Sequence, residues 1–359
     1  MNPKVSIVIP VYNVAPYLRE CLDSVLAQSL TEIEILCGDG GSTDGSLEIL
    51  HEYAERDARI QIISKQGSGY GQSMNDCIAI ARGEYIGIVE SDDTITPDMY
   101  QALYERAVQD KLDWVRGDIY FSFSDKCEKK NLRYEKIIIG NFYNKVLNPQ
   151  CNVRPWRSRM RTWSGIYNRE FLLNNNILHN ETPGGSYQDI GFYLKTLYFA
   201  QRVEFVPQGF YIWRQDNPNS TIHYDGTKLA NKVIDEWKLN QEHLDNLPQA
   251  RAWERAGFQY RKYSSYMWAI EQLNGTEKEA LKRIAIQELA ISFHKQEIKR
   301  AYFRPIEWYE FRVLLAKEKS PDEQWLLLRK LKYRLKSFGF VREVNEWIKQ
   351  ISSAMKRKA

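Results

Sequence analysis

Three stretches near the N-terminus decide the fold: VSIVIP at residues 5–10, EIEILC at residues 32–37 and EYIGIV at residues 84–89. Each has the length of a strand and is dominated by apolar, often β-branched residues, a pattern typical of buried strands. Apolar residues at helical spacing follow the first two, from Pro16 and from the end of the turn-rich residues 38–45. Because strands that alternate with helices pair in parallel through right-handed crossovers, we expect an α/β fold, a mostly parallel open sheet with helices on both faces.

The rest of the chain continues this alternation and then changes character. Residues 59–63 predict another strand, and a helix is expected over residues 72–82, ending at Gly83 as a left-handed cap. Residues 126–160 show no regular period. Beyond about residue 225 the pattern is helical, so we expect an α/β domain over residues 1–225 and a helical C-terminal domain over residues 226–359.

Composition narrows the class of protein. The chain has 359 residues, of which 43% are hydrophobic and 27% charged, enough to form a real core. No apolar run approaches the roughly 18 residues that cross a bilayer, and the N-terminus lacks the arrangement of a signal peptide. The cysteines number five, without C-x-x-C spacing, which argues against a disulfide framework or a structural zinc. We therefore expect a cytoplasmic protein.

Charge is distributed unevenly. The overall formal charge is +4, but residues 1–250 hold 26 basic and 33 acidic side chains, whereas residues 251–359 hold 24 and 13. Residues 325–340 interleave Leu, Trp, Tyr and Phe with Arg and Lys and contain no acidic residue. This pattern predicts peripheral attachment to an anionic membrane surface, here the inner face of the plasma membrane. The alternative is a helical bundle whose cations pair with the acidic part of the chain or with a partner protein.

Acidic residues follow two of the predicted strands. Asp39 follows the second strand, and Glu90, Asp92 and Asp93 follow the one at residues 84–89. Ligands of such sheets bind at the carboxyl ends of the strands. Carboxylates together with substrate phosphates are the ligands that Mg²⁺ or Mn²⁺ prefers, so a metal-bridged diphosphate is one interpretation. An Asx-rich turn that caps the next helix is the other.

Three ordered blocks carry a family resemblance: residues 5–30, 34–50 and 83–93. They resemble the inverting glycosyltransferases of family 2, which have the GT-A fold; the likeness is strong over residues 4–120 and weak over residues 160–222. It implies transfer of a hexose or N-acetylhexosamine from a nucleotide sugar, with a uridine-linked donor expected. The implied acceptor is a saccharide, free or lipid-linked, in the synthesis of a bacterial surface polysaccharide such as capsule or lipopolysaccharide.

The resemblance also assigns donor-binding residues. It implies contacts with the nucleotide sugar for Pro10, Tyr12, Asn13, Asp39, Lys65, Asn75, Glu90, Ser91 and Arg214. Lys65 begins a glycine-containing loop that could equally be a flexible connection, and Asn75 could equally be a surface amide. Two positions depart from the family pattern: Gly40 replaces an aspartate, and Glu90 replaces the first aspartate of D-x-D.

Catalytic, metal and acceptor roles follow from the same resemblance. Asp189 is the expected general base, preceded by Gln188 where the family has glutamate; alternatively it only interacts with the dipole of the helix that it begins. Asp92 and His223 are the expected metal ligands, although a lone histidine is more often a surface residue. Trp163 and Gln188 are expected to contact the acceptor, although Trp163 could equally be a core residue.

Other classes of protein remain open at this point. A nucleotidyltransferase would share the acidic site but needs a basic activation motif near the N-terminus, and none is visible. A non-catalytic saccharide-binding or scaffold protein that kept the fold is compatible with the changes at Gly40, Glu90 and Gln188. No nucleic-acid reader motif accompanies the basic charge. Oligomeric state is left open.

Overall fold

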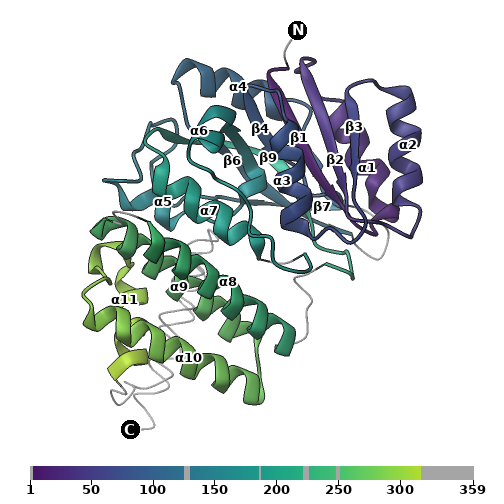
Figure 1. Cartoon of the computed structure of the whole chain (residues 1–359). Coiled ribbons are helices and arrows are strands. Elements are labelled where there is room, and N and C mark those ends of the chain that lie inside the picture. The colour runs from purple at the N-terminus through teal and green to yellow at the C-terminus, as the bar shows by residue number, and fades with distance from the viewer. Residues whose placement is uncertain (1–2, 125–129, 186, 221–225, 248–250, 317–359) are drawn as a thin grey trace, which may run out of the picture. The chain divides into compact units, whose positions relative to one another are not determined.

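The computed structural model describes residues 3–124, 130–185, 187–220, 226–247 and 251–316. The chain divides into two compact units, residues 1–281 and residues 282–359, and each is described by itself. Figure 1 shows the arrangement of the helices and strands, most of them labelled. No helix among the described residues is both long and apolar enough to cross a membrane.

A sheet of nine strands among the described residues forms the centre of the first unit. Its order is β3-β2-β1-β4-β8-β6-β9-β5, and β7 pairs with β6. The strands are β1 Val5–Val11, β2 Ile33–Asp39, β3 Ile60–Ser64, β4 Tyr85–Ile88, β5 Thr94–Ile95, β6 Trp114–Ser124, β7 Lys130–Glu135, β8 Gly165–Asn168 and β9 Val203–Arg214.

Strand direction brings the predicted site to one edge of the sheet. β1 pairs in parallel with β2 and β4, and β2 pairs in parallel with β3. β8 lies antiparallel between β4 and β6, so β6 and its parallel neighbour β9 run in the direction of β4. The expected mostly parallel open sheet is confirmed, and the carboxyl ends of these parallel strands share one edge.

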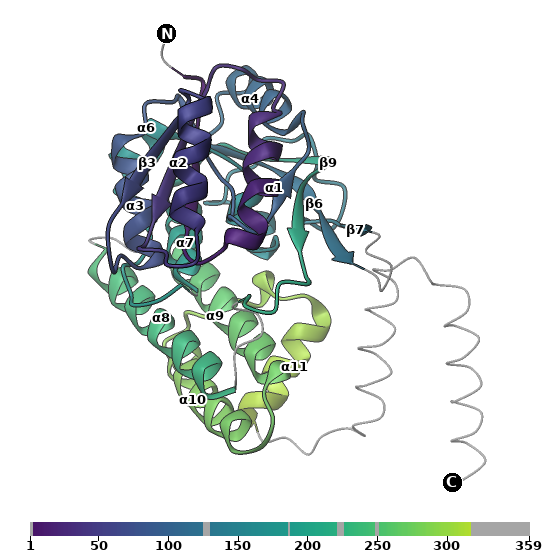
Figure 2. The same ribbon diagram turned by 90° about the vertical axis from the view of Figure 1, so that its right-hand side faces the viewer.

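Helices cover the sheet where the apolar periodicity placed them. The first helices are α1 Ala15–Leu26, α2 Ser46–Arg56, α3 Tyr70–Ile80 and α4 Met99–Gln109. Figure 2 shows α1 and α2 side by side, and α3 packs on β1 and β2. Further along the chain lie α5 Val153–Arg157, the 3₁₀ turn Thr162–Ser164, α6 Arg169–Asn174 and α7 Gln188–Phe199.

The segment without a regular period contains more structure than its sequence indicates. β7 forms an antiparallel hairpin with β6, and the short helix α5 follows it. Trp156 on α5 is fully buried and its indole N–H donates to the carbonyl oxygen of Pro149 at 2.9 Å. Tertiary packing around this tryptophan, which no local period reveals, orders the segment.

Helices continue the first unit beyond the last strand. α8 Gly226–Asn246 and α9 Ala252–Gln272 belong to the same compact unit as the sheet, and α10 Gly275–His294 crosses its end. The change from mixed to helical structure lies between β9 and α8, as the sequence indicates. A separate domain from residue 226 onward stays a prediction.

The second unit is small within the described residues. After the end of α10 it holds a 3₁₀ turn, Arg300–Tyr302, and α11 Pro305–Ala316. Its core is aromatic, because the Phe303 ring lies 5.3 Å from that of Phe311 and 5.4 Å from that of Trp308.

Gly83 has a different role from the expected one. α3 ends at Ile80, and Gly83 does not lie in the left-handed region of backbone conformation. Instead it passes directly over β1, where an added Cβ would lie 2.4 Å from the Ser6 nitrogen. Close approach of two backbones, rather than a helix cap, requires glycine here.

Replacing Gly83 by alanine tests this explanation. We expect Gly83→Ala to lower the free energy of unfolding by roughly 1–3 kcal/mol, because the new methyl group must displace β1 or the bend that contains Gly83. Urea unfolding measures the change. Gly185→Ala is the control, since its Cβ would meet only the Cβ of Tyr70, at 3.9 Å, and should leave stability nearly unchanged.

Candidate active site

Asp39 closes the end of β2. Its side chain is fully buried, and its Oδ2 accepts hydrogen bonds from the Gly41 nitrogen at 3.0 Å and the Ser64 hydroxyl at 2.9 Å. Its Oδ1 accepts from the Ser42 nitrogen at 3.1 Å. These bonds hold the carboxylate rigidly at the edge where the parallel strands end.

The loop after β1 lies against the loop after β2. The Asn13 side-chain oxygen accepts from the Thr43 backbone nitrogen at 2.8 Å, and the Asn13 backbone nitrogen donates to the Ser42 hydroxyl at 3.1 Å. Asn13 has a φ of 49°, a left-handed conformation that asparagine tolerates. Pro10 is buried in β1 beside Gly38, whereas Tyr12 is 65% exposed. Pro10, Tyr12, Asn13 and Asp39 are therefore brought together.

The glycine that replaces the family's aspartate has a steric reason. A Cβ on Gly40 would lie 2.8 Å from the carbonyl oxygen of Ser68. The Gly67 nitrogen also donates to the Gly40 carbonyl at 3.2 Å, so the loop that begins at Lys65 packs directly on this position. An aspartate at residue 40 would require that loop to move. Lys65 itself is exposed, and its Nζ lies 3.5 Å from an Asp76 carboxylate oxygen.

The acidic cluster of Glu90, Asp92 and Asp93 is held by tyrosines and by β9. The Tyr70 hydroxyl donates to Glu90 Oε1 at 2.8 Å. The Tyr211 hydroxyl donates to Asp93 Oδ2 at 2.8 Å and accepts from the Glu90 nitrogen at 2.9 Å. The loop is thereby fastened to a strand that lies more than a hundred residues further along the chain.

Burial changes the ionisation of Glu90 and Asp93. It raises the pKa of Glu90 to about 8, and the neighbouring charges of Asp92 and Asp189 act in the same direction. Burial also raises the pKa of Asp93 well above its usual range. Near neutral pH Glu90 therefore tends to keep its proton, as a buried carboxyl group beside like charges is expected to do. Ser91, between Glu90 and Asp92, is buried.

Arg214 lies at the end of β9 beside Asp92. Its Nε donates to the Asp92 carbonyl at 2.8 Å, its Nη2 pairs with Glu20, and its guanidinium lies 4.8 Å from the centre of the Tyr17 ring. Asp92 Oδ2 accepts from the Asn217 side chain at 2.7 Å. The Arg214 guanidinium therefore lies next to Asp92, the expected metal ligand. Other protein groups, Glu20 and Tyr17, already contact this guanidinium.

Asp189 lies in the first turn of α7, half-buried. Burial raises the pKa of this carboxyl, and the nearby Arg161 guanidinium opposes the rise. Asp189 in turn contributes to the raised pKa of Glu90 and of Tyr70. The expected base and the acidic cluster therefore share one site, although 96 to 99 residues separate them in the sequence.

Gln188 and Asn75 bind protein groups near Asp189. The buried Gln188 amide donates to the carbonyl oxygens of Thr182 and Gly184 at 3.2 and 3.1 Å. The Asn75 side-chain amide donates to the His179 backbone carbonyl at 3.0 Å and accepts from the His179 backbone nitrogen at 2.8 Å. Both side chains hold the segment that leads into α7, so ligand contacts of Gln188 and Asn75 stay predictions.

A buried glutamate of α8 completes the support of this segment. Glu236 Oε2 accepts from the Asn180 amide at 2.8 Å, and Oε1 accepts from the Thr182 hydroxyl. Nothing in the sequence pattern identifies Glu236, because a single acidic residue in a helical pattern gives no signal of burial.

Trp163 belongs to the layer beneath the site. It is only 8% exposed and stacks on Tyr211 with ring centres 4.1 Å apart. Contact between Trp163 and the acceptor stays a prediction. His223 and the basic residues 325–340 lie outside the described residues.

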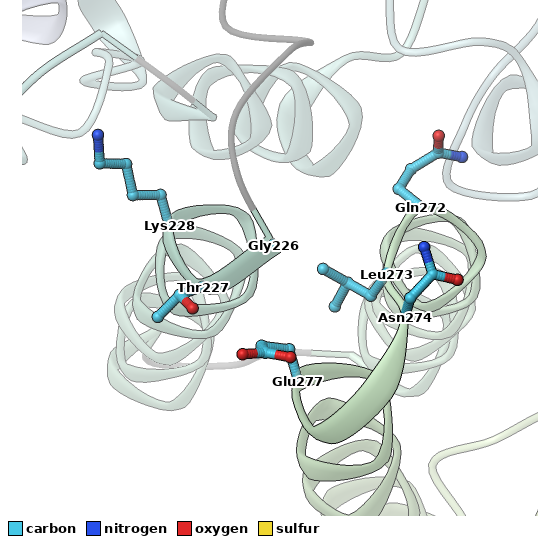
Figure 3. Close-up of a pocket in the computed structure, with 7 residues that line it drawn as sticks. All are labelled: Gly226, Thr227, Lys228, Gln272, Leu273, Asn274 and Glu277. Carbon is cyan, nitrogen blue, oxygen red and sulfur yellow. The ribbon is translucent and has the colours of Figure 1, made fainter.

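No group of three or more His, Cys, Asp or Glu side chains within the described ranges is arranged to hold a metal ion. A cavity of about 600 Å³ lies elsewhere, where α8 begins, α9 ends and α10 begins. Figure 3 shows its lining, which includes Lys228, Gln272, Asn274 and Glu277. None of the residues assigned to the donor, metal or acceptor lines it.

Comparison with known proteins identifies the family. A family model described as Glycosyl transferase family 2 matches residues 6–170. The glycosyltransferase GlyG of Streptococcus pneumoniae is 38% identical over 235 residues, which cover 65% of this chain and 68% of GlyG. The chain belongs to glycosyltransferase family 2. Its resemblance over the N-terminal blocks is thereby confirmed.

Other comparisons agree with this family 2 assignment. An uncharacterized glycosyltransferase of Bacillus subtilis, EpsJ, is 36% identical over 222 residues, which cover 61% of this chain and 63% of EpsJ. The crystal structure of S. aureus TarS 1–349 in complex with UDP-GlcNAc matches with a TM-score of 0.64 at 18% identity, over 93% of this chain and 92% of that one. At this identity the match shows the GT-A fold alone.

A buried histidine in the segment before α7 makes the folding stability of this family 2 chain sensitive to acid. Burial lowers the pKa of His179 to about 3, and neither ring nitrogen has a hydrogen-bond partner among the described residues. The ring stacks on Phe192 at 4.4 Å. Below about pH 6.5 His179 is protonated in the unfolded chain but stays neutral in the folded chain. The free energy of unfolding therefore falls as the pH falls from about 6.5 toward 3.

His179→Phe should remove this contribution, since phenylalanine keeps the stacking and binds no proton. We expect the slope of unfolding free energy against pH between 4 and 6 to decrease by up to about 1.4 kcal/mol per pH unit. Urea unfolding at several pH values measures it. His51→Gln, at an exposed position on α2, should leave the slope unchanged; an unchanged slope in His179→Phe contradicts the prediction.

Proposed function

We propose that the chain is an inverting glycosyltransferase that moves a hexose or N-acetylhexosamine from a nucleotide diphosphate sugar to a saccharide hydroxyl. The observation that carries the proposal is the convergence of Asp39, the acidic cluster and Asp189 at one edge of the sheet. The family membership supports the same reaction class.

The nucleotide would bind over the ends of β1 and β2. Exposed Tyr12 offers a ring face for stacking, and the rigid Asp39 carboxylate offers an acceptor for a base N–H. A uridine-linked donor is consistent with the TarS structure, whose complex contains UDP-GlcNAc. The sugar then lies toward Asp92 and Asp189.

A divalent metal fits this site only together with the substrate. Among the described residues Asp92 is the carboxylate suited to hold it, because Glu90 and Asp93 have raised pKa values and tyrosine partners. One or two carboxylates plus diphosphate oxygens suffice for Mg²⁺ or Mn²⁺. The metal would offset the negative charge that develops on the leaving diphosphate.

Asp189 would act as the general base. A bond forms between the acceptor oxygen and the anomeric carbon while the bond from that carbon to the diphosphate breaks, and Asp189 takes the acceptor proton. Burial raises the pKa of Asp189, which makes its carboxylate a better proton acceptor, and the Arg161 guanidinium opposes the rise. Attack from the face opposite the leaving group inverts the anomeric configuration.

The acceptor class and the cellular location complete the proposal. We infer a saccharide acceptor, free or lipid-linked, in surface polysaccharide synthesis, and attachment to the inner face of the plasma membrane through residues 325–340. The first rests on the resemblance, and the second on the pattern of charge in the sequence.

Asp189→Asn tests the base directly. We expect transfer from UDP-GlcNAc or another UDP-sugar to fall by about 10²- to 10⁴-fold, because asparagine cannot accept the proton, while donor binding stays near its original strength. Transfer rates and calorimetric titration of UDP measure the two effects. Unchanged transfer would show that Asp189 is not the base.

Asp92→Asn tests the metal ligand. We expect the dependence of UDP affinity on Mn²⁺ to be lost together with transfer, since the amide is a poor ligand for a hard cation. Asp98→Asn is the matched control, because Asp98 is exposed at the start of α4. Retention of a manganese effect in Asp92→Asn would remove this residue from the metal site.

A further inference from the structure

Five aromatic rings form a continuous row along β9 and β6, here called the aromatic row: Tyr211, Trp163, Trp213, Phe121 and Phe123. Ring centres are 4.1 Å apart from Tyr211 to Trp163 and 5.7 Å from Trp163 to Trp213. They are 5.2 Å apart from Trp213 to Phe121 and 6.3 Å from Phe121 to Phe123. Nothing in the proposed reaction uses the outer part of this row.

Strand register explains why the rings share one face. Trp213 of β9 pairs with Phe121 of β6, and Tyr211 pairs with Ile119. Residues two apart on a strand point to the same side, about 6.6 Å further along. Phe123 is the next residue on this face of β6, and Arg133 enters it from β7, which lies beside β6 in Figure 2.

The inner end of the row is the candidate active site. The Tyr211 hydroxyl holds Asp93 and the backbone of Glu90, as described above. Arg161, which acts on Asp189, lies 4.3 Å from the centre of the Trp213 ring. The row therefore begins beside the expected base.

Accessibility differs among the rings of the row. Tyr211, Trp163 and Phe121 are buried, Trp213 is half-buried, and Phe123 is 37% exposed. A guanidinium lies over each accessible ring: Arg161 lies 4.3 Å from the centre of Trp213, and Arg133 lies 5.5 Å from the centre of Phe123. The buried ring of Phe121 lies between the two accessible rings and holds them in place.

We propose that the aromatic row binds the part of a saccharide acceptor that lies behind its reacting hydroxyl, with one sugar unit at Trp213 and another toward Phe123. This proposal rests on the proposed function. The C–H face of a pyranose packs on an aromatic ring, and a neighbouring guanidinium donates hydrogen bonds to the hydroxyl groups of the sugar. The spacing along the strands is comparable with the length of one sugar unit, so the acceptor is a chain rather than a monosaccharide.

Binding of oligosaccharides to the full chain tests the proposal. The probes are hexamers, dimers and monomers of N-acetylglucosamine, glucose and mannose and of alternating glucuronate and N-acetylhexosamine, titrated in the presence of UDP and Mn²⁺. Tryptophan fluorescence and saturation-transfer NMR report binding. We expect at least one hexamer to bind about tenfold or more tightly than its monomer.

Variants of the row separate ring stacking from general apolar contact. Phe123→Ala and Phe123→Leu should both reduce hexamer affinity about tenfold and leave monomer affinity unchanged, because leucine keeps apolar volume but lacks a flat face. Trp213→Phe should retain more hexamer affinity than Trp213→Ala. Leu132→Ala is the matched control, because Leu132 is 53% exposed on the same hairpin but points to the opposite face. It should bind as the unchanged chain does.

Three outcomes would overturn the proposal. Affinity that is independent of chain length would do so, as would equal affinity in the Phe123 variants, or a lack of binding by every hexamer while the chain still hydrolyses a UDP-sugar. Loss of retention on vesicles of phosphatidylglycerol and phosphatidylcholine in Phe123→Ala, with saccharide binding unchanged, would make the row a membrane contact instead. Failure of UDP-sugar hydrolysis and transfer in the unchanged chain would count against the proposed function, which the binding assay does not measure.

Discussion

The hydroxyl of Tyr211 is the contact on which the site depends. It donates to the carboxylate of Asp93 and accepts from the backbone of Glu90, and so joins the loop after β4 to the middle of β9. Without this bond Asp93 Oδ2 would lose its partner, although Oδ1 would still accept from the Arg214 backbone nitrogen, and an unpaired buried polar atom costs more than an ordinary hydrogen bond contributes. The same ring stacks on Trp163, so the aromatic core beneath fixes the position of the hydroxyl.

The second constraint is the support of the segment before α7. Helix α3 holds it through Asn75, α7 through Gln188 and α8 through Glu236. Each of these side chains lies on a different element, and together they set where the first turn of α7 places Asp189. This arrangement explains why α8 belongs to the compact unit of the sheet: its buried carboxylate takes part in positioning the expected base.

Departures from the family pattern have physical causes in the structure. Gly40 lies so close to the Ser68 carbonyl that a side chain does not fit without movement of the adjoining loop. Glu90 has one methylene more than aspartate and reaches the Tyr70 hydroxyl in a buried position. Gln188 places an uncharged amide where a charged group would have to be buried, and this amide donates to two carbonyls. These substitutions therefore fit their surroundings.

The sequence by itself determined strands β1 to β4, their parallel pairing and the edge where ligands are expected to bind, because buried strands and amphipathic helices are encoded by local period. Its blocks also determined the family, and from it the predicted roles of Asp39, Asp92 and Asp189. Only the tertiary structure decided which polar side chains hold the protein together, as for Asn75, Gln188 and Glu236, and why Gly83 and Gly40 are glycines. It alone assembled the aromatic row from β6, β9 and the turn at Trp163. Such contacts join residues that are far apart in the chain, and neither local period nor charge pattern carries information about which distant groups meet.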